Sequence, residues 1–289
     1  MTDIVHVENL VKRYDDLIAL DHFNLSIAPG EIFGLLGPNG SGKTTSINCI
    51  LQLLAYDKGT IELFGEPMTP ARYDLKRRIG VVPQQVAVFD ELTVRENIDY
   101  FCSLYVNDRK RRRALVDEAI DFVGLGDFTK FRPGKLSGGL ARRLNIACGI
   151  AHKPELIFFD EPTVGLDPEE RIHFRNLFSR TAEEHLVLLS THIIEDVQSV
   201  CDQIVVIHHG TILFTGTPEQ LIQSATGHVG VFWEKDETLE QGLHITARVN
   251  TSQGIRCRAV ADKLPSYAQA EEPSLEDAYL YLISREAAQ

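Results

Sequence analysis

The 289-residue sequence lacks features that mark several classes of protein. No run of 18 or more apolar residues occurs, so we expect no segment to cross a membrane. Residues 1–16 carry charges throughout and lack the basic start and apolar core of a secretory signal. Basic residues are not in excess, because the formal net charge is −12, and this argues against nucleic acid as a main partner.

Cysteine pairs with metal-binding or redox spacing are also absent. The five cysteines are widely spaced and form no C-x-x-C pair: Cys49, Cys102, Cys148, Cys201 and Cys257. We expect them to be reduced and mostly buried thiols of a cytosolic protein. The doublet His208–His209 precedes Gly210 and predicts a turn between strands rather than a metal site.

Short apolar segments alternate with segments of helical spacing along most of the chain. We predict strands at residues 4–8, 22–27, 32–37, 58–64, 78–82, 156–160, 186–190, 203–209 and 211–214. We predict helices at 43–54, 93–105, 108–123, 168–184 and 194–201, with Thr93 and Glu96 as a capping box. Strands alternating with helices predict an α/β fold, with a mostly parallel sheet covered by helices on both faces. Residues 85–152 are expected to form a helical subdomain.

The character of the sequence changes near residue 224. We therefore divide the chain into a main domain, residues 1–224, and a small C-terminal appendage, residues 225–289. The appendage contains three alternating segments that predict an antiparallel sheet, VGVFWEK, LHITARVN and GIRCRAVAD. A short helix is expected at 274–285, so the appendage is α+β.

A glycine-rich loop follows the buried strand at 32–37 and precedes a helix. It reads Gly37-Pro38-Asn39-Gly40-Ser41-Gly42-Lys43-Thr44, followed by Thr45, and fits the P-loop pattern G-x-x-x-x-G-K-[ST]. The glycines let backbone N–H groups point at phosphate oxygens, and the helix adds its positive end. Lys43 supplies a charge to the β- and γ-phosphates of a nucleotide, and Thr44 offers a hydroxyl to Mg²⁺.

Two carboxylates end the apolar strand LIFFD. Asp160 and Glu161 should face the same phosphate pocket, because ligands bind beyond the carboxyl ends of parallel strands. We expect Asp160 to hold Mg²⁺ and Glu161 to polarise the attacking water. No N-K-x-D guanine motif occurs, which argues against a GTPase.

A second short motif, Leu136-Ser137-Gly138-Gly139, lies just ahead of a helix. With it, the sequence resembles the nucleotide-binding subunits of ATP-binding-cassette (ABC) transporters over about residues 4–222. The resemblance implies a P-loop NTPase fold with an antiparallel β part. It also implies the residues of the site. Tyr14 would stack on adenine, Gln84 would lie between the two subdomains, and Ser137–Gly139 would form the signature. The acidic pair is Asp160–Glu161, Asp167 lies in the loop that follows it, and His192 is the switch histidine.

The resemblance implies a shared ATP site. Ser137–Gly139 at a helix N-terminus is a second anion site, and two phosphate sites in one chain make sense if two chains share each nucleotide. A head-to-tail dimer is therefore expected, with Lys43, Glu161 and His192 as catalytic residues. Thr44, Gln84 and Asp160 are expected to hold Mg²⁺. Leu140 departs from the family, which usually has glutamine there, and predicts a dimer that ATP stabilises weakly.

Two further runs resemble exporters of the drug, lipid and polysaccharide type. They are residues 190–221 and the segment PSLEDAYLYLI at 273–283. The implied function is ATP hydrolysis that powers export through a separate membrane permease, at the cytoplasmic face of the cell membrane. A groove for the permease is expected near residues 84–105, and the basic run 109–113 is either a solvated helix face or a contact for anionic lipid.

Two alternatives remain open from the sequence. One is a soluble cassette ATPase that acts on ribosomes or DNA, and the other is a non-catalytic binding subunit. The single cassette argues against the first, and the intact set of Lys43, Asp160, Glu161 and His192 argues against the second. The transported substrate is not encoded in any of these motifs.

Overall fold

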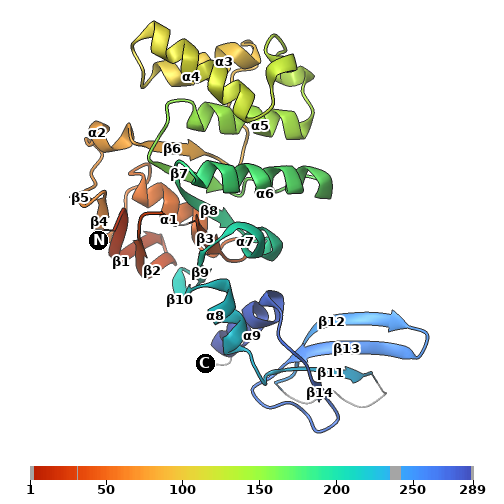
Figure 1. Cartoon of the computed structure of the whole chain (residues 1–289). Helices are drawn as coiled ribbons and strands as arrows, with labels where there is room; N and C mark the ends of the chain where they lie inside the picture. Colours follow the sequence, from red (N-terminus) through yellow and green to blue (C-terminus); the bar gives the residue numbers. More distant parts are fainter. Residues whose placement is uncertain (1–2, 31, 235–241, 288–289) are drawn as a thin grey trace.

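The computed structural model describes residues 3–30, 32–234 and 242–287. Figure 1 shows a body in which strands and helices are layered, with two helices at one end and a smaller C-terminal part projecting from the other. The bounds of the elements follow from short apolar strands separated by capped helices.

The central sheet has six strands in the order β10-β9-β3-β8-β7-β6. They are β3 (Ile32–Leu36), β6 (Ile79–Val82), β7 (Leu156–Asp160), β8 (Leu186–Thr191), β9 (Gln203–His208) and β10 (Thr211–Gly216). All neighbours pair in parallel except β10, which is antiparallel to β9. Both β3 and β7 are buried along their whole length, because layers pack on both of their faces. The predicted mostly parallel sheet is confirmed.

Different layers cover the two faces of this sheet. One face packs against α1 (Lys43–Ile50) and an antiparallel sheet of β1 (Val5–Tyr14), β2 (Leu17–Ile27), β4 (Lys58–Leu63) and β5 (Glu66–Pro67). The other face packs against α5 (Gly138–Ile150), α6 (Pro168–Ala182) and α7 (Ile194–Val200). Side chains of β3 alternate accordingly, since Phe33 and Leu35 join the first core and Ile32 and Leu36 the second.

Two helices extend beyond strand β6, namely α3 (Val94–Ser103) and α4 (Arg109–Phe122). Thr93 caps α3, and Glu96 completes the capping box as predicted. The Asp108 side chain caps α4 by accepting a hydrogen bond from the Arg111 N–H at 2.6 Å. Short helices complete this part of the chain: α2 (Tyr73–Lys76), η1 (Gly126–Phe128) and η2 (Pro133–Lys135).

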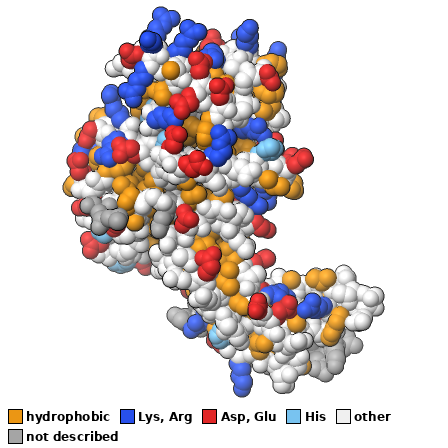
Figure 2. Space-filling model, viewed as in Figure 1, with side chains coloured by type: hydrophobic (Ala, Val, Ile, Leu, Met, Phe, Trp, Pro, Cys, Tyr) orange, Lys and Arg blue, Asp and Glu red, His pale blue; other side chains and the backbone are white. Residues whose placement is uncertain are grey.

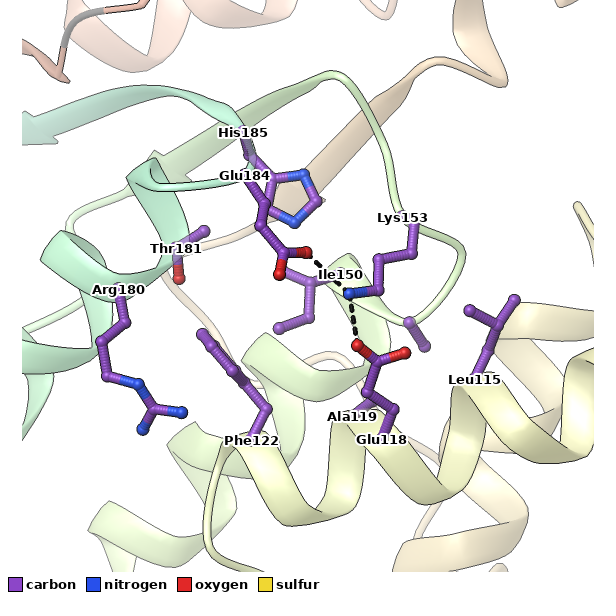
Figure 3. A pocket seen from close by; sticks show the side chains of 11 residues that line it. Leu115, Glu118, Ala119, Phe122, Ile150, Lys153, Arg180, Thr181, Glu184 and His185 are labelled. Carbon is purple, nitrogen blue, oxygen red and sulfur yellow. Dashed lines mark hydrogen bonds and ion pairs between the residues drawn. The ribbon is translucent and has the colours of Figure 1, made fainter.

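A small pocket lies between α4, the end of α5 and α6 (Figure 3). The Lys153 ammonium there donates to Glu118 Oε1 at 2.6 Å and to Glu184 Oε2 at 2.8 Å. On the other side of the pocket, the Arg180 guanidinium lies 4.5 Å from the centre of the Phe122 ring. These contacts connect α4 to the body.

The C-terminal part follows α8 (Pro218–Ser224) and contains a third, antiparallel sheet in the order β12-β13-β11-β14. Its elements are β11 (Val229–Trp233), β12 (His244–Thr251), β13 (Gly254–Val260), β14 (Gln269–Ala270) and α9 (Leu275–Ala287). The three longer strands and the helix agree with the prediction for this region. The part projects from the body in Figure 2. Even so, Leu275 and Tyr281 of α9 join the same buried core as Val197 and Ile204 of the body.

Some predicted limits were wrong. The first strand runs to Tyr14 rather than to residue 8, and α1 ends at Ile50 rather than at Leu54. The helix stops because Gln52 adopts a left-handed φ of +56°, which continues no right-handed helix. The five cysteines are all buried, as predicted. Within the described ranges, the helices are too short or too polar to cross a lipid bilayer.

Candidate nucleotide-binding site

The loop at residues 37–44 connects β3 to α1, as the sequence predicted. A Cβ atom on Gly37 would lie 2.3 Å from the Ile207 carbonyl oxygen and 2.6 Å from Ser41 Oγ, so only glycine fits. Gly42 has a φ of +108° immediately before the helix, a conformation that suits glycine. The loop therefore curls tightly over the N-terminus of α1, where helix N–H groups attract anions.

Lys43 is the charged group of this loop. Its ammonium donates to the carbonyl oxygens of Gly37 at 2.7 Å and Pro38 at 3.1 Å. The same nitrogen lies 3.1 Å from Glu161 Oε1, and each side chain is only 5% exposed. A buried ammonium at the mouth of an anion-binding loop is suited to hold phosphate oxygens.

The carboxylate of Asp160 lies beside the loop. Its Oδ2 accepts a hydrogen bond from Thr44 Oγ1 at 2.9 Å, and its Oδ1 accepts one from Ser190 Oγ. Asp160 ends β7 and Ser190 lies on the adjacent strand β8, so the parallel sheet itself aligns them. Two residues 116 positions apart, Thr44 and Asp160, thus meet as the two motifs predicted.

Glu161 follows β7 in an unusual conformation, with a φ of +47°. Its N–H donates to the Ser190 carbonyl oxygen at 3.0 Å, which fixes the backbone. The His192 Nδ1–H donates to Glu161 Oε2 at 2.9 Å. A contact chain therefore runs from Lys43 through Glu161 to His192, and it joins three side chains that the sequence singled out as catalytic. A strained backbone held by its neighbours is typical of functional positions.

Lys43, Thr44 and Glu161 line a pocket of about 600 Å³, a size that suits a small-molecule ligand, whereas Asp160 and His192 lie behind them and do not line it. The lining residues include nine that the sequence predicted: Tyr14, Asn39, Gly40, Gly42, Lys43, Thr44, Thr45, Gln84 and Glu161. Tyr14 is 44% exposed at the end of β1, and the Lys12 ammonium lies 4.9 Å from the centre of its ring. Gln84 is exposed, and its carbonyl oxygen accepts a hydrogen bond from Arg142.

Four lining residues were not predicted from the sequence. Leu17, Ile18 and Ala19 follow Tyr14 closely in β2, so their nearness to Tyr14 was an available signal. His209 lies on the turn between β9 and β10, and its sequence neighbourhood predicted the turn but not its place in the pocket wall.

The signature residues lie outside this pocket. Ser137 caps α5, with its Oγ accepting a hydrogen bond from the Leu140 N–H at 3.3 Å, and Asp167 caps α6 in the same way. Ser137, Gly138 and Asp167 are exposed. One chain therefore presents two separate groups of the predicted residues. Leu140 packs against the main core, which accounts for an apolar residue at this position.

The chemistry of the pocket fits a nucleotide with magnesium. Ser41 Oγ is buried without a hydrogen-bond partner among the described residues, and the buried Glu161 Oε1 is paired with the Lys43 ammonium at 3.1 Å. Thr44 and Asp160 offer hard oxygen ligands of the kind that Mg²⁺ prefers. No group of three or more His, Cys, Asp or Glu side chains in the described ranges could hold a metal alone. The residues thus fit an ion that arrives with phosphate oxygens, as Mg²⁺ usually does.

Comparisons with known proteins agree with this geometry. Residues 20–164 match the family model described as ABC transporter. Nod factor export ATP-binding protein I of Burkholderia thailandensis is 38% identical over 224 residues, which cover 77% of this chain and 74% of that protein. The protein of the same name from Burkholderia orbicola is 34% identical over 98% of this chain and 87% of its own length. The linearmycin resistance ATP-binding protein LnrL of Bacillus subtilis is 35% identical over 78% of this chain and 72% of its own length.

Solved structures show the same architecture. The protein cbiO1 of Clostridium perfringens, part of the ABC transporter complex cbiONQ, gives a TM-score of 0.71 at 27% identity, over 77% of this chain and 92% of that one. The dimeric bacterial ABC transporter cassette MJ0796 gives a TM-score of 0.68 at 27% identity, over 74% of this chain and 98% of that one. Together with the P-loop, the acidic strand end and the pocket between them, these similarities show that the chain belongs to the ABC transporter family, as an ATP-hydrolysing subunit.

Proposed function

We propose that this chain powers export of a substrate through a separate membrane permease, from the cytoplasmic face of the membrane. The relatives named for Nod factor export and linearmycin resistance support the direction of transport. One of them aligns with 98% of this chain, so the similarity includes the C-terminal part. The structural neighbour cbiO1, described as part of a transporter complex, supports a separate permease.

The contact chain Lys43–Glu161–His192 carries the proposed mechanism. When ATP occupies the loop, Lys43 holds its β- and γ-phosphates and gives up part of its contact with Glu161. Glu161 then accepts a hydrogen bond from the attacking water and polarises it. His192 orients the Glu161 carboxylate through Nδ1, and we propose that it also contacts the γ-phosphate of bound ATP.

Thr44, Asp160 and Gln84 are the residues that we propose to hold Mg²⁺. The ion supplies neutralisation of the charge that develops on the transferred phosphoryl group. The hydrogen bond between Thr44 and Asp160 keeps two candidate ligands together on the loop side. Gln84 also lines the pocket, and it connects the pocket to the helical region because Arg142 of α5 donates a hydrogen bond to its carbonyl oxygen.

A second copy of the chain would complete the site. Ser137–Gly139 and Asp167 lie at the N-termini of α5 and α6, outside the pocket of their own chain. We propose that they contact the ATP held by Lys43 of the partner in a head-to-tail dimer. The dimeric neighbour MJ0796 supports such an arrangement. We further propose that residues 1–224 form the nucleotide-binding domain and residues 225–289 the appendage.

The variant Glu161→Gln tests the mechanism. We expect ATP turnover to fall by roughly 10²–10⁴-fold, because the base is lost, while ATP binding persists. Steady-state phosphate release and binding of a fluorescent ATP analogue measure the two effects. Glu183→Gln is the matched control, because Glu183 is exposed. Turnover at the wild-type rate in Glu161→Gln would show that another residue activates the water.

The transport assignment needs a separate test. The tagged chain, expressed in its native host, should purify from membranes together with a multi-span protein that changes its ATPase rate. Recovery only with ribosomes or DNA would contradict a transporter, whatever the outcome for Glu161.

A further inference from the structure

The turn between β9 and β10 forms part of the wall of the ATP pocket. It consists of His209 and Gly210, with φ values of +45° and +78°, and it joins His208 to its partner Thr211. Two consecutive left-handed residues form the tight hairpin turn that twisted strands favour. His209 adopts this conformation without being glycine, and its side chain is exposed toward the pocket where Tyr14 and Ile18 also lie.

Hydrogen bonds on two sides hold this turn in place. The Gly210 N–H donates to the Ser41 carbonyl oxygen of the P-loop at 2.9 Å, and its own carbonyl oxygen accepts from the Asp21 N–H at 3.0 Å. A Cβ atom on Gly210 would lie 2.6 Å from the Ala19 carbonyl oxygen, so the turn is packed against β2. His209 is therefore presented between the phosphate loop and the strand that follows the adenine residue Tyr14.

Helix α9 of the C-terminal part reaches the same turn. The His208 Nδ1–H donates a hydrogen bond to Glu286 Oε2, and the two side chains are only 14% and 30% exposed. The ring centres of His208 and His209 are 4.0 Å apart. A continuous set of contacts thus runs from Glu286 through His208 to His209 in the pocket wall. A partly shielded, charge-assisted bond of this kind restrains a side chain better than an exposed ion pair does.

We propose that His209 contacts the nucleoside part of bound ATP, and that Glu286 is a positioning residue that acts through His208. This inference rests on the proposed ATP site. The imidazole of His209 offers a donor and an acceptor to ribose hydroxyls, and a ring edge or face to the base. Tyr14 forms one wall of the base site, and His209 supplies a second wall.

A coupling between the C-terminal part and the nucleotide follows. When α9 is docked and Glu286 binds His208, the arrangement of His209 that binds ATP is favoured. By linkage, bound ATP favours the docked position of α9 to the same degree. The appendage is then part of the nucleotide site rather than a separate module.

The first experiment compares two ligands in the full chain. For His209→Ala, we expect the Kd for ATP to rise roughly 3–10-fold, the scale of one or two lost hydrogen bonds. The Kd for inorganic tripolyphosphate should stay unchanged, because this probe lacks the nucleoside. An unchanged Kd for ATP, or an equal loss for both ligands, would overturn the nucleoside contact.

The second experiment tests the positioning role of Glu286. Glu286→Gln should raise the KM for ATP about 2–5-fold with the same kcat, the effect of partial disordering of one contact. Glu276→Gln on the exposed side of α9 is the matched control, and the thermal unfolding midpoint of each variant checks that the fold is intact. In the double variant His209→Ala/Glu286→Gln, the Glu286 effect should disappear.

Additive effects in the double variant would overturn the route through His209. An unchanged KM in Glu286→Gln would overturn the positioning role. A wild-type chain that binds no ATP would instead remove the proposed site itself, so the two failures are distinguishable.

Discussion

The two halves of the proposed ATP site are held in different ways. In the half built on residues 37–44, main-chain atoms fix the loop, since Gly37 N–H donates to the Thr191 carbonyl oxygen at 3.3 Å and Ser41 accepts from Gly210. In the signature half, Ser137 caps its own helix, and Gly139 lies against the Glu170 side chain, whose carboxylate Arg143 binds. The first half is therefore formed by the core of one chain, whereas the second is an exposed surface that needs a partner.

Replacing Gly37 by alanine should have the largest effect, because it disturbs the half of the site that main-chain atoms hold in place. The added methyl would lie 2.3 Å from a backbone oxygen of β9, so the loop has to shift. We expect loss of detectable ATP binding and a fall of about 1–3 kcal/mol in the free energy of unfolding. Urea unfolding and titration with a fluorescent ATP analogue measure both.

Gly138→Ala is the matched change in the other half. A Cβ atom there meets no atom within 4 Å of the single chain. We expect normal stability and ATP binding, but roughly 10²-fold slower hydrolysis because the partner's ATP is displaced. Normal hydrolysis in this variant would place the signature outside the site.

His192→Ala tests a side-chain contact in the first half of the site. It removes the 2.9 Å hydrogen bond to Glu161, and a bond to a charged group contributes about 1.5–3 kcal/mol. We therefore expect kcat to fall roughly 10–100-fold with little change in ATP affinity. The exposed His173→Ala serves as control, and equal activity of both variants would exclude an orienting role for His192.

His152 tests how the signature helix is anchored to the sheet. It follows α5, its Nε2–H donates to the Ile79 carbonyl oxygen of β6 at 3.1 Å, and its ring stacks on Tyr105 at 3.8 Å. Burial lowers the pKa of His152 to about 4. The unfolded chain binds this proton below about pH 6.5 and the folded chain does not, so stability should fall as the pH drops from about 6.5 to 4, by up to about 3 kcal/mol.

The variant His152→Phe keeps an aromatic ring and removes this titration. Urea unfolding at pH 7 and pH 5 should show a smaller pH-dependent loss than in the wild type. A residual slope is expected from His185, whose pKa burial also lowers. Identical slopes in both proteins would mean that His152 is protonated in the folded chain.

Leu140→Gln should produce the smallest effect. It introduces the residue that usually follows the signature in this family, at the cost of an apolar contact with the main core. In the Glu161→Gln background, we expect ATP-dependent dimerisation to strengthen by a few fold, roughly one added hydrogen bond. Analytical ultracentrifugation with and without ATP measures the dissociation constant of the dimer. An unchanged dissociation constant would show that Leu140 does not weaken the ATP-bound dimer.

The P-loop and the acidic strand end were predictable because their chemistry depends on short, contiguous motifs. Lys43, Asp160 and Glu161 meet where the parallel sheet aligns β3, β8 and β7, and alternating strands and helices indicated that sheet. The capping box at Thr93 was predictable for the same reason, since it depends on residues three apart.

Contacts between distant segments were not predictable in this way. Nothing near His209 in the sequence indicates that Ser41 and Asp21 fix its turn, because both lie more than 160 positions away. The C-terminal end of α1 was predicted wrongly because Gln52 adopts a left-handed φ, and no glycine or proline at this position signals the end of a helix. The continuous core shared by α9 and the body also joins residues about 80 positions apart, such as Val197 and Tyr281.

This shared core has a consequence for synthesis on the ribosome. Val197, Ile204 and Leu221 of the body belong to the same buried core as Leu275 and Tyr281 of α9, so this part of the core is incomplete until α9 has been made. At about 5–20 residues per second, the chain takes several seconds to proceed from α8 to α9. During that interval an apolar surface of the nascent cassette is open to water and to chaperones, so the timing of translation over the appendage should influence how much of the cassette reaches its native form.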